Sequence, residues 1–313
     1  MAKRWTASDV PDQSGKTFVI TGSNSGIGYE AALVLAQRGA EVILACRSQE
    51  KGQKALEQLR AGAPGAKAKL MKLDLSSLAS VRAFADQVKS EHGRIDALIN
   101  NAGLMAIPRA TTADGFEMQL GTNHLGHFAL TGLLFGRLLE TGSARVVNVA
   151  SQAHRMGKIN FADLMGEKRY EKWSAYGQSK LANLLFTFEL QRRIEKKWPS
   201  ATPVAALACH PGYSATELQG KGPELEKSAF NAFIMKVGNG ILAQSAAMGA
   251  LPTLRAACDP DAKSGEYYGP AGIGEMAGPP VKVGCTTAAR DPETAKKLWE
   301  RSVELTKVDF GGI

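Results

Sequence analysis

Short apolar runs alternate with longer stretches of helical spacing from residue 16 onward. The apolar runs, which are rich in β-branched residues, predict strands over residues 17–21, 41–45, 68–73, 97–100, 145–149 and 204–208. Apolar positions three and four residues apart predict helices over residues 27–38, 50–59, 78–91 and 174–194, and Asp291 and Pro292 mark the start of a last helix. The units recur about every 25 residues, which is typical of βα units stacked on a parallel sheet.

This alternation predicts an α/β fold in which one doubly wound sheet of the Rossmann type, mainly parallel, is flanked by helices. The chain has no composition break, long linker or internal repeat, so we expect a single domain over residues 1–313. Residues 1–14 and 270–313 are expected to be terminal extensions, and the glycine- and proline-rich stretch 269–284 a loop. Residues 152–174 and 219–240 are irregular; the second stretch is the expected substrate loop, with plain surface insertion as the alternative.

The composition is that of a globular protein, since 44% of the 313 residues are hydrophobic and 22% are charged. The net charge of +8 is spread over short basic groups, without an arginine-rich arm or a zinc-finger spacing, so no nucleic-acid partner is expected. Four widely spaced cysteines predict free thiols in a reducing compartment. Neither a secretory signal nor a sufficiently apolar span occurs, so the sequence predicts a cytoplasmic protein with no integral membrane segment.

A glycine cluster directly follows the first predicted strand and opens the first predicted helix. Glycines are needed at such a turn because the backbone bends sharply, approaches a pyrophosphate closely and lets the helix pack against the strand. The cluster lacks the lysine of a P-loop, and it has Asn24 where a hydrolase elbow needs serine. It therefore predicts a dinucleotide cradle formed by Gly22, Ser23, Asn24, Ser25, Gly26, Ile27 and Gly28.

The end of the second predicted strand indicates which dinucleotide binds. An acidic residue there would bind the ribose of NAD, whereas an arginine accommodates the 2′-phosphate of NADP. The chain has Arg47 and Ser48 and no carboxylate in this window, so NADP(H) is favoured over NAD(H). Asp74 and Leu75 close the third strand, where the carboxylate either accepts from the adenine amino group or caps the next helix.

Tyr176 and Lys180 lie four residues apart in a predicted helix, so their side chains share one face. An ammonium beside a phenol favours the phenolate, and each unit by which the pKa falls corresponds to about 1.4 kcal/mol. Ser151 lies at the carboxyl end of the fifth strand, at the edge where such sheets bind ligands. A tyrosine that exchanges a proton, beside a serine that hydrogen-bonds a substrate oxygen, indicates acid–base chemistry.

Together these motifs resemble those of the short-chain dehydrogenase/reductase family. The chain has TGxxxGIG at 21–28, NNAG at 100–103, Ser151, and YxxxK at 176–180, in the family's order. The resemblance implies that Asn123 is a further catalytic residue beside Ser151, Tyr176 and Lys180, and that it holds a water linking Lys180 to solvent. It also implies cofactor contacts from Tyr176 and Lys180 and from Asn101, Ala102, Gly103, Pro211, Gly212 and Thr216.

In the reaction that the resemblance implies, NADPH passes hydride to a carbonyl carbon while Tyr176 protonates the oxygen, and oxidation of an alcohol runs in reverse. Ser151 polarises the oxygen, and Lys180 binds the nicotinamide ribose and tunes Tyr176. The segments 44–47, 123–128, 150–154 and 210–212 are most similar to the branch with the retinol dehydrogenases and the WW-domain oxidoreductase. This likeness implies an apolar, retinoid- or lipid-like substrate. The candidate pocket residues, which ordinary core packing would explain equally well, are Leu104, Met105, Phe161, Phe230, Phe233 and Met235.

Other interpretations of the same residues stay open. An NADP(H)-binding regulator with little turnover would keep the fold, although it would not need all four catalytic residues. No metal site is expected, because the candidate histidines lie on different segments: His124, His127, His154 and His210. Members of the family commonly pair through two long helices, here around residues 118–140 and 174–194, so we expect a homo-oligomer that acts on a small molecule.

Overall fold

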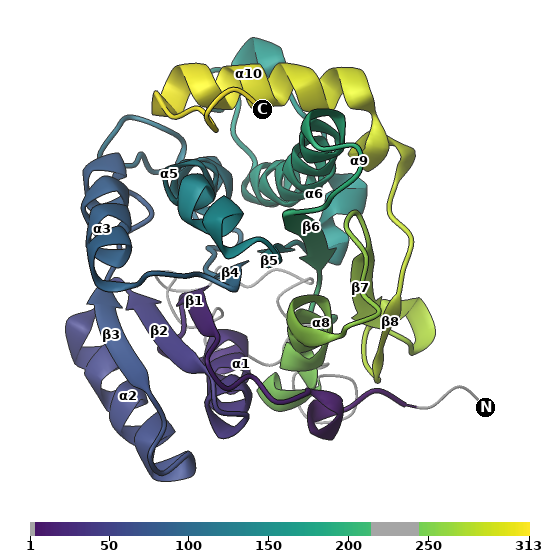
Figure 1. Ribbon diagram of the computed structural model, residues 1–313. Coiled ribbons are helices and arrows are strands. Elements are labelled where there is room, and N and C mark those ends of the chain that lie inside the picture. The colour runs from purple at the N-terminus through teal and green to yellow at the C-terminus, as the bar shows by residue number, and fades with distance from the viewer. Residues whose placement is uncertain (1–3, 214–243) are drawn as a thin grey trace.

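The computed structural model describes residues 4–213 and 244–313. Within this described part, eight strands form one sheet in the order β3-β2-β1-β4-β5-β6-β7-β8 (Figure 1). Neighbouring strands from β3 to β7 are parallel, and β8 is antiparallel to β7. The strands are β1 (Thr17–Thr21), β2 (Glu41–Cys46), β3 (Ala68–Lys72), β4 (Ala97–Asn100), β5 (Ala144–Val149), β6 (Val204–Cys209), β7 (Tyr267–Pro270) and β8 (Pro280–Lys282).

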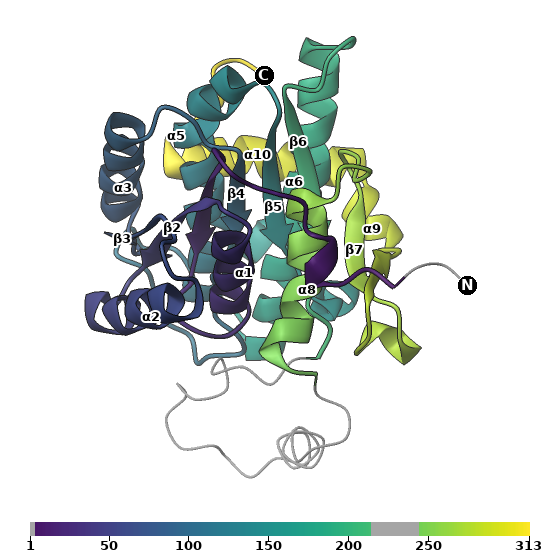
Figure 2. The same ribbon diagram turned by 60° about the horizontal axis from the view of Figure 1, so that its bottom comes forward.

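Helices cover both faces of the sheet (Figures 1 and 2). One face carries α1 (Gly26–Gln37), α2 (Gln49–Gly62) and α8 (Ala246–Cys258), and the other carries α3 (Leu78–Glu91), α5 (Gly126–Thr141) and α6 (Lys172–Lys197). The predicted fold, a single doubly wound α/β domain, is confirmed. The shorter elements are η1 (Ala7–Asp9), α4 (Met118–Leu120), η2 (Gly121–Leu125), η3 (Gln152–Met156), η4 (Phe161–Asp163), η6 (Ile273–Glu275) and α9 (Thr287–Arg290).

The central strand β1 illustrates why the apolar runs become strands buried on both sides. All five of its residues are buried. Phe18 and Ile20 pack in the core under α1 and α8, whereas Val19 packs in the core on the opposite face. Successive side chains of a strand point to opposite faces, so a parallel sheet that is covered twice requires a continuous apolar run.

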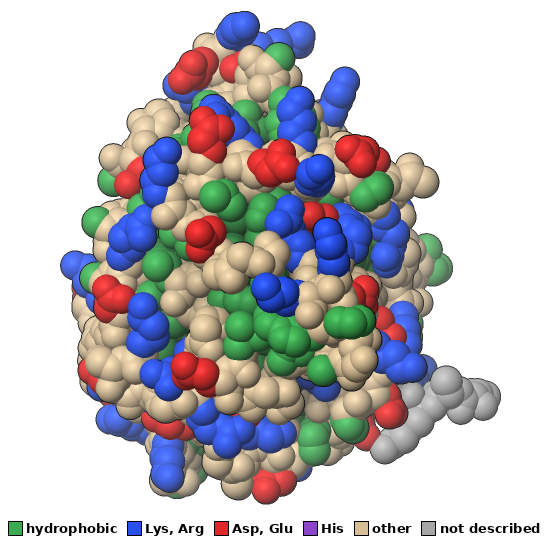
Figure 3. Space-filling model, turned by 45° about the horizontal axis from the view of Figure 1, so that its top comes forward, with side chains coloured by type: hydrophobic (Ala, Val, Ile, Leu, Met, Phe, Trp, Pro, Cys, Tyr) green, Lys and Arg blue, Asp and Glu red, His purple; other side chains and the backbone are tan. Residues whose placement is uncertain are grey.

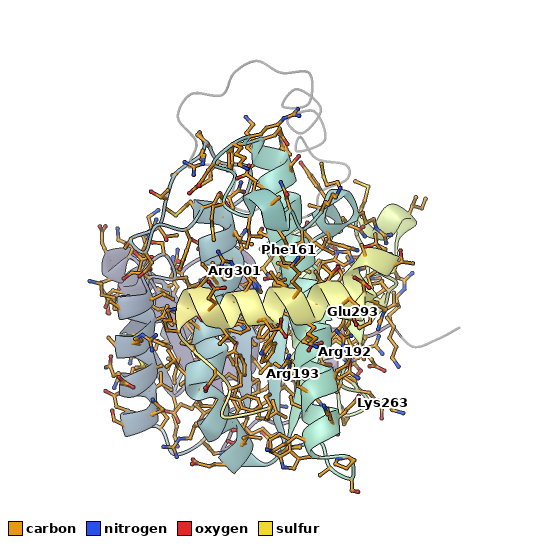
Figure 4. The ribbon with its side chains drawn as sticks, turned by 90° about the horizontal axis from the view of Figure 1, so that it is seen from above. Phe161, Arg192, Arg193, Lys263, Glu293 and Arg301 are labelled. Atoms are coloured by element: carbon orange, nitrogen blue, oxygen red, sulfur yellow. The ribbon has the colours of Figure 1, made fainter. Side chains whose placement is uncertain are left out.

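A last helix, α10 (Pro292–Thr306), lies across α5 and α6 on the outside of the molecule (Figure 4). Four aromatic rings join these helices to the end of the chain, with centroids 4.5–6.1 Å apart: Phe128, Phe186, Trp299 and Phe310. The guanidinium of Arg193 on α6 lies over the Trp299 ring at 4.5 Å. α10 thus crosses the outer side of the two long helices through which a homo-oligomer is expected.

Two further expectations concern the part of the chain near the C-terminus. Residues 269–284, predicted to be a loop, contain the end of β7 and all of β8, so that prediction is wrong. These strands are short, and prolines end β7 and open β8, so the stretch lacks the run of β-formers by which strands are predicted. The predicted substrate loop, residues 219–240, lies outside the described residues, as do Phe230, Phe233 and Met235.

On the face formed partly by α10, Lys and Arg side chains lie among Asp and Glu side chains (Figure 3). Arg301 pairs with Glu304 there, and Arg192 pairs with Glu189 at 2.8 Å. The basic side chains of this face are therefore interspersed with acidic ones. Within residues 4–213 and 244–313, no helix has the length and apolarity that crossing a membrane would require.

Candidate active site

Four strand ends meet at one edge of the sheet. β1, β4, β5 and β6 are consecutive and parallel, so the segments that follow them are neighbours. The glycine cluster follows β1, the NNAG turn follows β4, Ser151 follows β5, and the Pro211–Gly212 turn follows β6. The strand order reverses direction between β1 and β4, and sheets of this type bind ligands at that point.

The glycines of the cradle leave no room for side chains. Gly22 and Gly26 have φ angles of +67° and +59°. A Cβ atom on Gly22 would lie 2.9 Å from Cα of Ala102, and one on Gly28 would lie 2.5 Å from Nδ2 of Asn101. The turn between β1 and α1 is therefore pressed against the NNAG turn, and backbone atoms form the cradle.

The other cradle residues divide into buried supports and open positions. Ser23 is buried and its hydroxyl donates to the Ile20 carbonyl at 3.0 Å, so it stabilises the turn from beneath. Ile27, in the first turn of α1, is buried in the core on the inner side of that helix. Asn24 is half-buried beside Ser25, which precedes α1 but whose hydroxyl caps none of the first N–H groups of the helix. Those N–H groups suit an anionic ligand.

Thr21, the last residue of β1, ties the cradle to the NNAG turn. Its Oγ1 accepts from the backbone N–H groups of Asn101 and Ala102, each at 2.9 Å. The Asn101 side chain donates in return to the Thr21 carbonyl at 2.8 Å. The two turns therefore form one rigid unit at the ends of β1 and β4.

The residues predicted to select the cofactor lie at the ends of β2 and β3. Arg47 is exposed directly after β2, and Ser48 caps α2 by accepting from a first-turn N–H at 3.3 Å. The Asp74 carboxylate accepts from the N–H and hydroxyl of Ser76 at 2.9 and 2.6 Å, and Leu75 is buried. The prediction that Asp74 caps the next helix is wrong, because Ser77 caps α3 by accepting from the N–H of Ser80 at 3.3 Å; the contact with adenine stays a prediction.

Tyr176 and Lys180 share one face of α6 and meet Ser151 at the end of β5. Nζ of Lys180 lies 5.8 Å from the centroid of the Tyr176 ring and donates to the Val149 carbonyl at 3.0 Å. The Ser151 side chain lies close enough to the Tyr176 phenol to lower its pKa. A Cβ on Gly103 of the NNAG turn would lie 3.5 Å from the same Nζ. The structure thus brings the three predicted groups together beside the cradle.

Burial sets the protonation of this pair, because only 8% of Tyr176 and 4% of Lys180 is exposed. Loss of hydration raises the pKa of Tyr176 to about 12, although the hydrogen bond from Ser151 lowers it. Burial likewise lowers the pKa of Lys180 to about 8. The sequence predicts that the ammonium favours the phenolate. In the folded chain desolvation of the phenolate dominates, so Tyr176 is a neutral phenol at pH 7.

Asn123 lies where the helix predicted around residues 118–140 changes its winding. The α-helical turn α4 passes into the π-helical turn η2 before α5 begins, and Asn123 is in the middle of η2. Its side-chain amide accepts from the N–H of Leu104 at 2.7 Å and donates to the Leu104 carbonyl at 2.9 Å. It also donates to Oγ of Ser179 at 2.9 Å. π-Helical turns are rare and frequently occur at functional sites.

His210 orients the Pro211–Gly212 turn after β6. Its Nδ1 accepts from the N–H of Gly212 at 3.1 Å, and its Nε2 donates to Glu275 at 2.9 Å. Glu275 also accepts from Arg155 at 3.2 Å and has a φ of +56°, which is uncommon for a residue other than glycine. The sequence gives no signal for Glu275, since this carboxylate is 65 residues away from its histidine partner. Thr216 lies outside the described residues.

The candidate pocket residues fall into different surroundings. Leu104 and Met105 are half-buried in the segment that the amide of Asn123 holds. Phe161 lies near α10, where the Lys297 ammonium is 4.4 Å from the ring centroid (Figure 4). Packing against α10 therefore accounts for Phe161.

Comparison with known proteins agrees with this geometry. A family model described as short chain dehydrogenase matches residues 16–226. Retinol dehydrogenase 12 of Mus musculus is 42% identical over 298 residues, which cover 95% of this chain and 88% of that protein. Retinol dehydrogenase 13 of Mus musculus is 42% identical over 294 residues, covering 93% and 84%.

Solved structures share the fold over most of the chain. The crystal structure of an uncharacterised protein from Mycobacterium paratuberculosis has a TM-score of 0.79 and 42% identity, and it covers 98% of this chain and 99% of its own. A short-chain dehydrogenase from Shigella flexneri, complexed with NADP, has a TM-score of 0.62 at 21% identity over 83% of this chain and 98% of its own. This chain is therefore an alcohol/carbonyl oxidoreductase and belongs to the short-chain dehydrogenase/reductase family, in the branch of the retinol dehydrogenases.

Proposed function

We propose that this protein interconverts a carbonyl and an alcohol on an apolar substrate with NADP(H) as its cofactor. The observation that carries the proposal is the meeting of Tyr176, Lys180 and Ser151 at the end of β5, beside the glycine cradle. A regulator that only binds the dinucleotide would not require a buried ammonium next to a buried phenol, because both groups lose hydration there.

The residues around the cradle fit a dinucleotide phosphate. Gly22 and Gly28 leave backbone where a Cβ would collide, and the first N–H groups of α1 receive no cap from Ser25. Arg47 would pair with a 2′-phosphate from its exposed position after β2. The further positions proposed to contact the cofactor are Ser23, Asn24, Gly26, Ile27, Ser48, Asp74, Leu75, Asn101, Ala102, Gly103, Tyr176, Lys180, Pro211, Gly212 and Thr216.

When bound, NADP(H) would supply or accept the hydride. The chain's own residues handle the proton and the substrate oxygen. Tyr176 holds its proton at pH 7, which is the state required to protonate a carbonyl oxygen, and the Ser151 hydroxyl lies beside it to hydrogen-bond that oxygen. Lys180 has a pKa of about 8, so it exchanges a proton readily near neutral pH and can restore the proton to Tyr176 with water held at Asn123.

An apolar, retinoid- or lipid-like substrate is proposed from the names of the relatives, which are retinol dehydrogenases. The described apolar candidates near the site are Leu104, whose backbone Asn123 holds, and Met105, which follows it. A cytoplasmic location and assembly into a homo-oligomer stay predictions from the sequence.

Turnover with a panel of carbonyl compounds tests the proposal. The purified protein is mixed with NADPH or NADH and with retinaldehyde, long-chain aldehydes or short polar aldehydes, and oxidation is followed by the absorbance of the reduced nicotinamide. We expect NADPH to be oxidised with the apolar aldehydes. Binding of NADPH without turnover on any compound would contradict the proposal and favour a regulator.

The role of Arg47 has a test of its own. Arg47→Ala removes a charge-assisted pair with phosphate, so the KM for NADPH should rise about tenfold to a hundredfold while the KM for NADH stays the same. Lys54→Ala removes an equal charge from an exposed position of α2 and serves as the control. Equal changes in both variants would show that only the general field of the surface attracts the cofactor.

A further inference from the structure

His127 lies buried between the cradle and the turn that carries Asn123. It is the second residue of α5 and is 2% exposed. Its Nε2 is 2.9 Å from Oγ1 of Thr21, and its Nδ1 is 3.0 Å from the main-chain carbonyl oxygen of Asn123. One imidazole ring therefore connects the end of β1 with the π-helical turn η2.

The partners of His127 fix which nitrogen carries the proton. A carbonyl oxygen only accepts, so Nδ1 donates to Asn123. Oγ1 of Thr21 already accepts from the N–H groups of Asn101 and Ala102, each at 2.9 Å, so both of its lone pairs are used. The Thr21 hydroxyl can therefore only donate, and of its two acceptors Nε2 at 2.9 Å is closer than the Ile99 carbonyl at 3.4 Å. The ring is neutral, with its proton on Nδ1.

The surroundings keep the ring in this form. Burial, followed by the nearby Lys180 ammonium, lowers the pKa of His127 to about 4, although the bond to the Asn123 carbonyl raises it. A protonated ring would also bring a second N–H against the Thr21 oxygen, which has no free lone pair. His127 therefore holds its position in one protonation state over the pH range in which Lys180 titrates.

We propose that His127 is a positioning residue that couples the cofactor cradle to Asn123. Through Nε2 it fixes the Thr21 hydroxyl, and with it the amides of the NNAG turn. Through Nδ1 it fixes the main-chain carbonyl of Asn123. The two amide hydrogens of Asn123 are committed to Leu104 and Ser179, so a water at Asn123 would bind one of its oxygens. The side-chain oxygen also accepts from Leu104, and His127 orients the main-chain oxygen. This inference rests on the proposed function.

Three variants separate the two hydrogen bonds. His127→Asn keeps a donor near the position of Nδ1 and loses the acceptor for Thr21. His127→Gln keeps an acceptor near the position of Nε2 and loses the donor to Asn123. His127→Phe keeps the ring and loses both bonds. The control is His124→Phe, which removes a buried imidazole from the preceding turn, where it bonds Ser302 at 2.9 Å.

The measurements are the Kd for NADPH by fluorescence, the kcat for carbonyl reduction, and the melting temperature. His127→Asn should weaken NADPH binding at least about fivefold and leave kcat within about twofold. His127→Gln should lower kcat at least about fivefold and leave the Kd within about twofold. His127→Phe should show both losses. His124→Phe should lower the melting temperature and should not change one of the Kd and kcat while leaving the other unchanged.

Equal changes of the Kd and kcat in His127→Asn and His127→Gln, or no change in either, would overturn the proposal. Nitrogen NMR of the wild-type protein, labelled with ¹⁵N-histidine, gives a second readout. The signal lost on substitution of His127 should show a protonated Nδ1 and an unprotonated Nε2. A proton on Nε2 would overturn the proposal even if a variant does not fold. Absence of turnover in the wild type would contradict only the proposed function, because the Kd and the NMR signal do not depend on turnover.

Discussion

The buried ammonium of Lys180 should lower the free energy of unfolding at neutral pH. Burial lowers the pKa of Lys180 from 10.5 to about 8. At pH 7 Lys180 is therefore protonated in both states, but the folded chain binds the proton less tightly than the unfolded chain does. One pKa unit corresponds to about 1.4 kcal/mol, and a shift of this size therefore destabilises the folded state by roughly 3 kcal/mol at neutral pH. The ammonium is almost wholly buried, so solvent screens this effect little.

Replacement of Lys180 by methionine should therefore raise the free energy of unfolding. Methionine is unbranched and fills the same channel without a charge. The variant loses the hydrogen bond from Nζ to the Val149 carbonyl, which contributes about 1 kcal/mol. We expect the free energy of unfolding to rise by a net value of about 2 kcal/mol at pH 7, together with a loss of turnover, as is common when a destabilising functional group is removed.

The stability that Lys180→Met gains over the wild type should decrease as the pH rises. Between about pH 8 and pH 10.5 the folded chain has released the Lys180 proton while the unfolded chain still binds it, so wild-type stability rises with pH. Lys180→Met has no such group. Its advantage should therefore shrink through this window and be gone by about pH 10.5.

Urea unfolding followed by circular dichroism at about pH 7 and about pH 10 measures both effects. Lys196→Met, which removes an exposed ammonium from the same helix, is the matched control and should leave stability unchanged within about 0.5 kcal/mol. A Lys180→Met protein less stable than the wild type at pH 7 would refute the reasoning. A gain that stays the same at both pH values would refute it as well.

Two other substitutions test the cradle and the C-terminal cover. Gly22→Ala should weaken NADPH binding, and it should lower the free energy of unfolding by about 2 kcal/mol more than Gly15→Ala does. Both glycines have a positive φ, but only Gly22 approaches Ala102. Equal losses of the two variants in urea unfolding would show that the close approach is unimportant. Phe310→Ala should lower the free energy of unfolding by about 3–5 kcal/mol, because the buried Phe310 ring packs between α5 and α10. Ile273, which is 97% exposed, is the control, and Ile273→Ala should change stability little. A small loss in Phe310→Ala would mean that α10 packs loosely against α5.

The apolar pattern predicts β1 to β6 to within one residue at each end, because strands buried on both sides leave a strong local signal. Helix ends were predictable where a side chain marks them. Asp291 accepts from the N–H of Thr294 at 2.9 Å at the start of α10. β7 and β8 have no comparable signal, because they are short and carry prolines.

The order of the site motifs could be predicted because each follows a strand, and parallel strands end at one edge of the sheet. What the sequence could not supply are the contacts between distant segments. Thr21 and His127 are 106 residues apart, and no local pattern joins them. The pKa of Tyr176 likewise depends on how deeply α6 is buried, which the spacing of Tyr176 and Lys180 does not reveal.

Tyr176→Phe tests the central claim most directly, with kcat for NADPH-dependent carbonyl reduction and the Kd for NADPH measured on the same preparation. Loss of the phenolic proton should lower kcat at least about a hundredfold. The Kd for NADPH should stay within about threefold of the wild type, because the phenylalanine ring takes the same place on α6 as the tyrosine ring. A variant that reduces the substrate at the wild-type rate would contradict the assignment of Tyr176 as the proton donor.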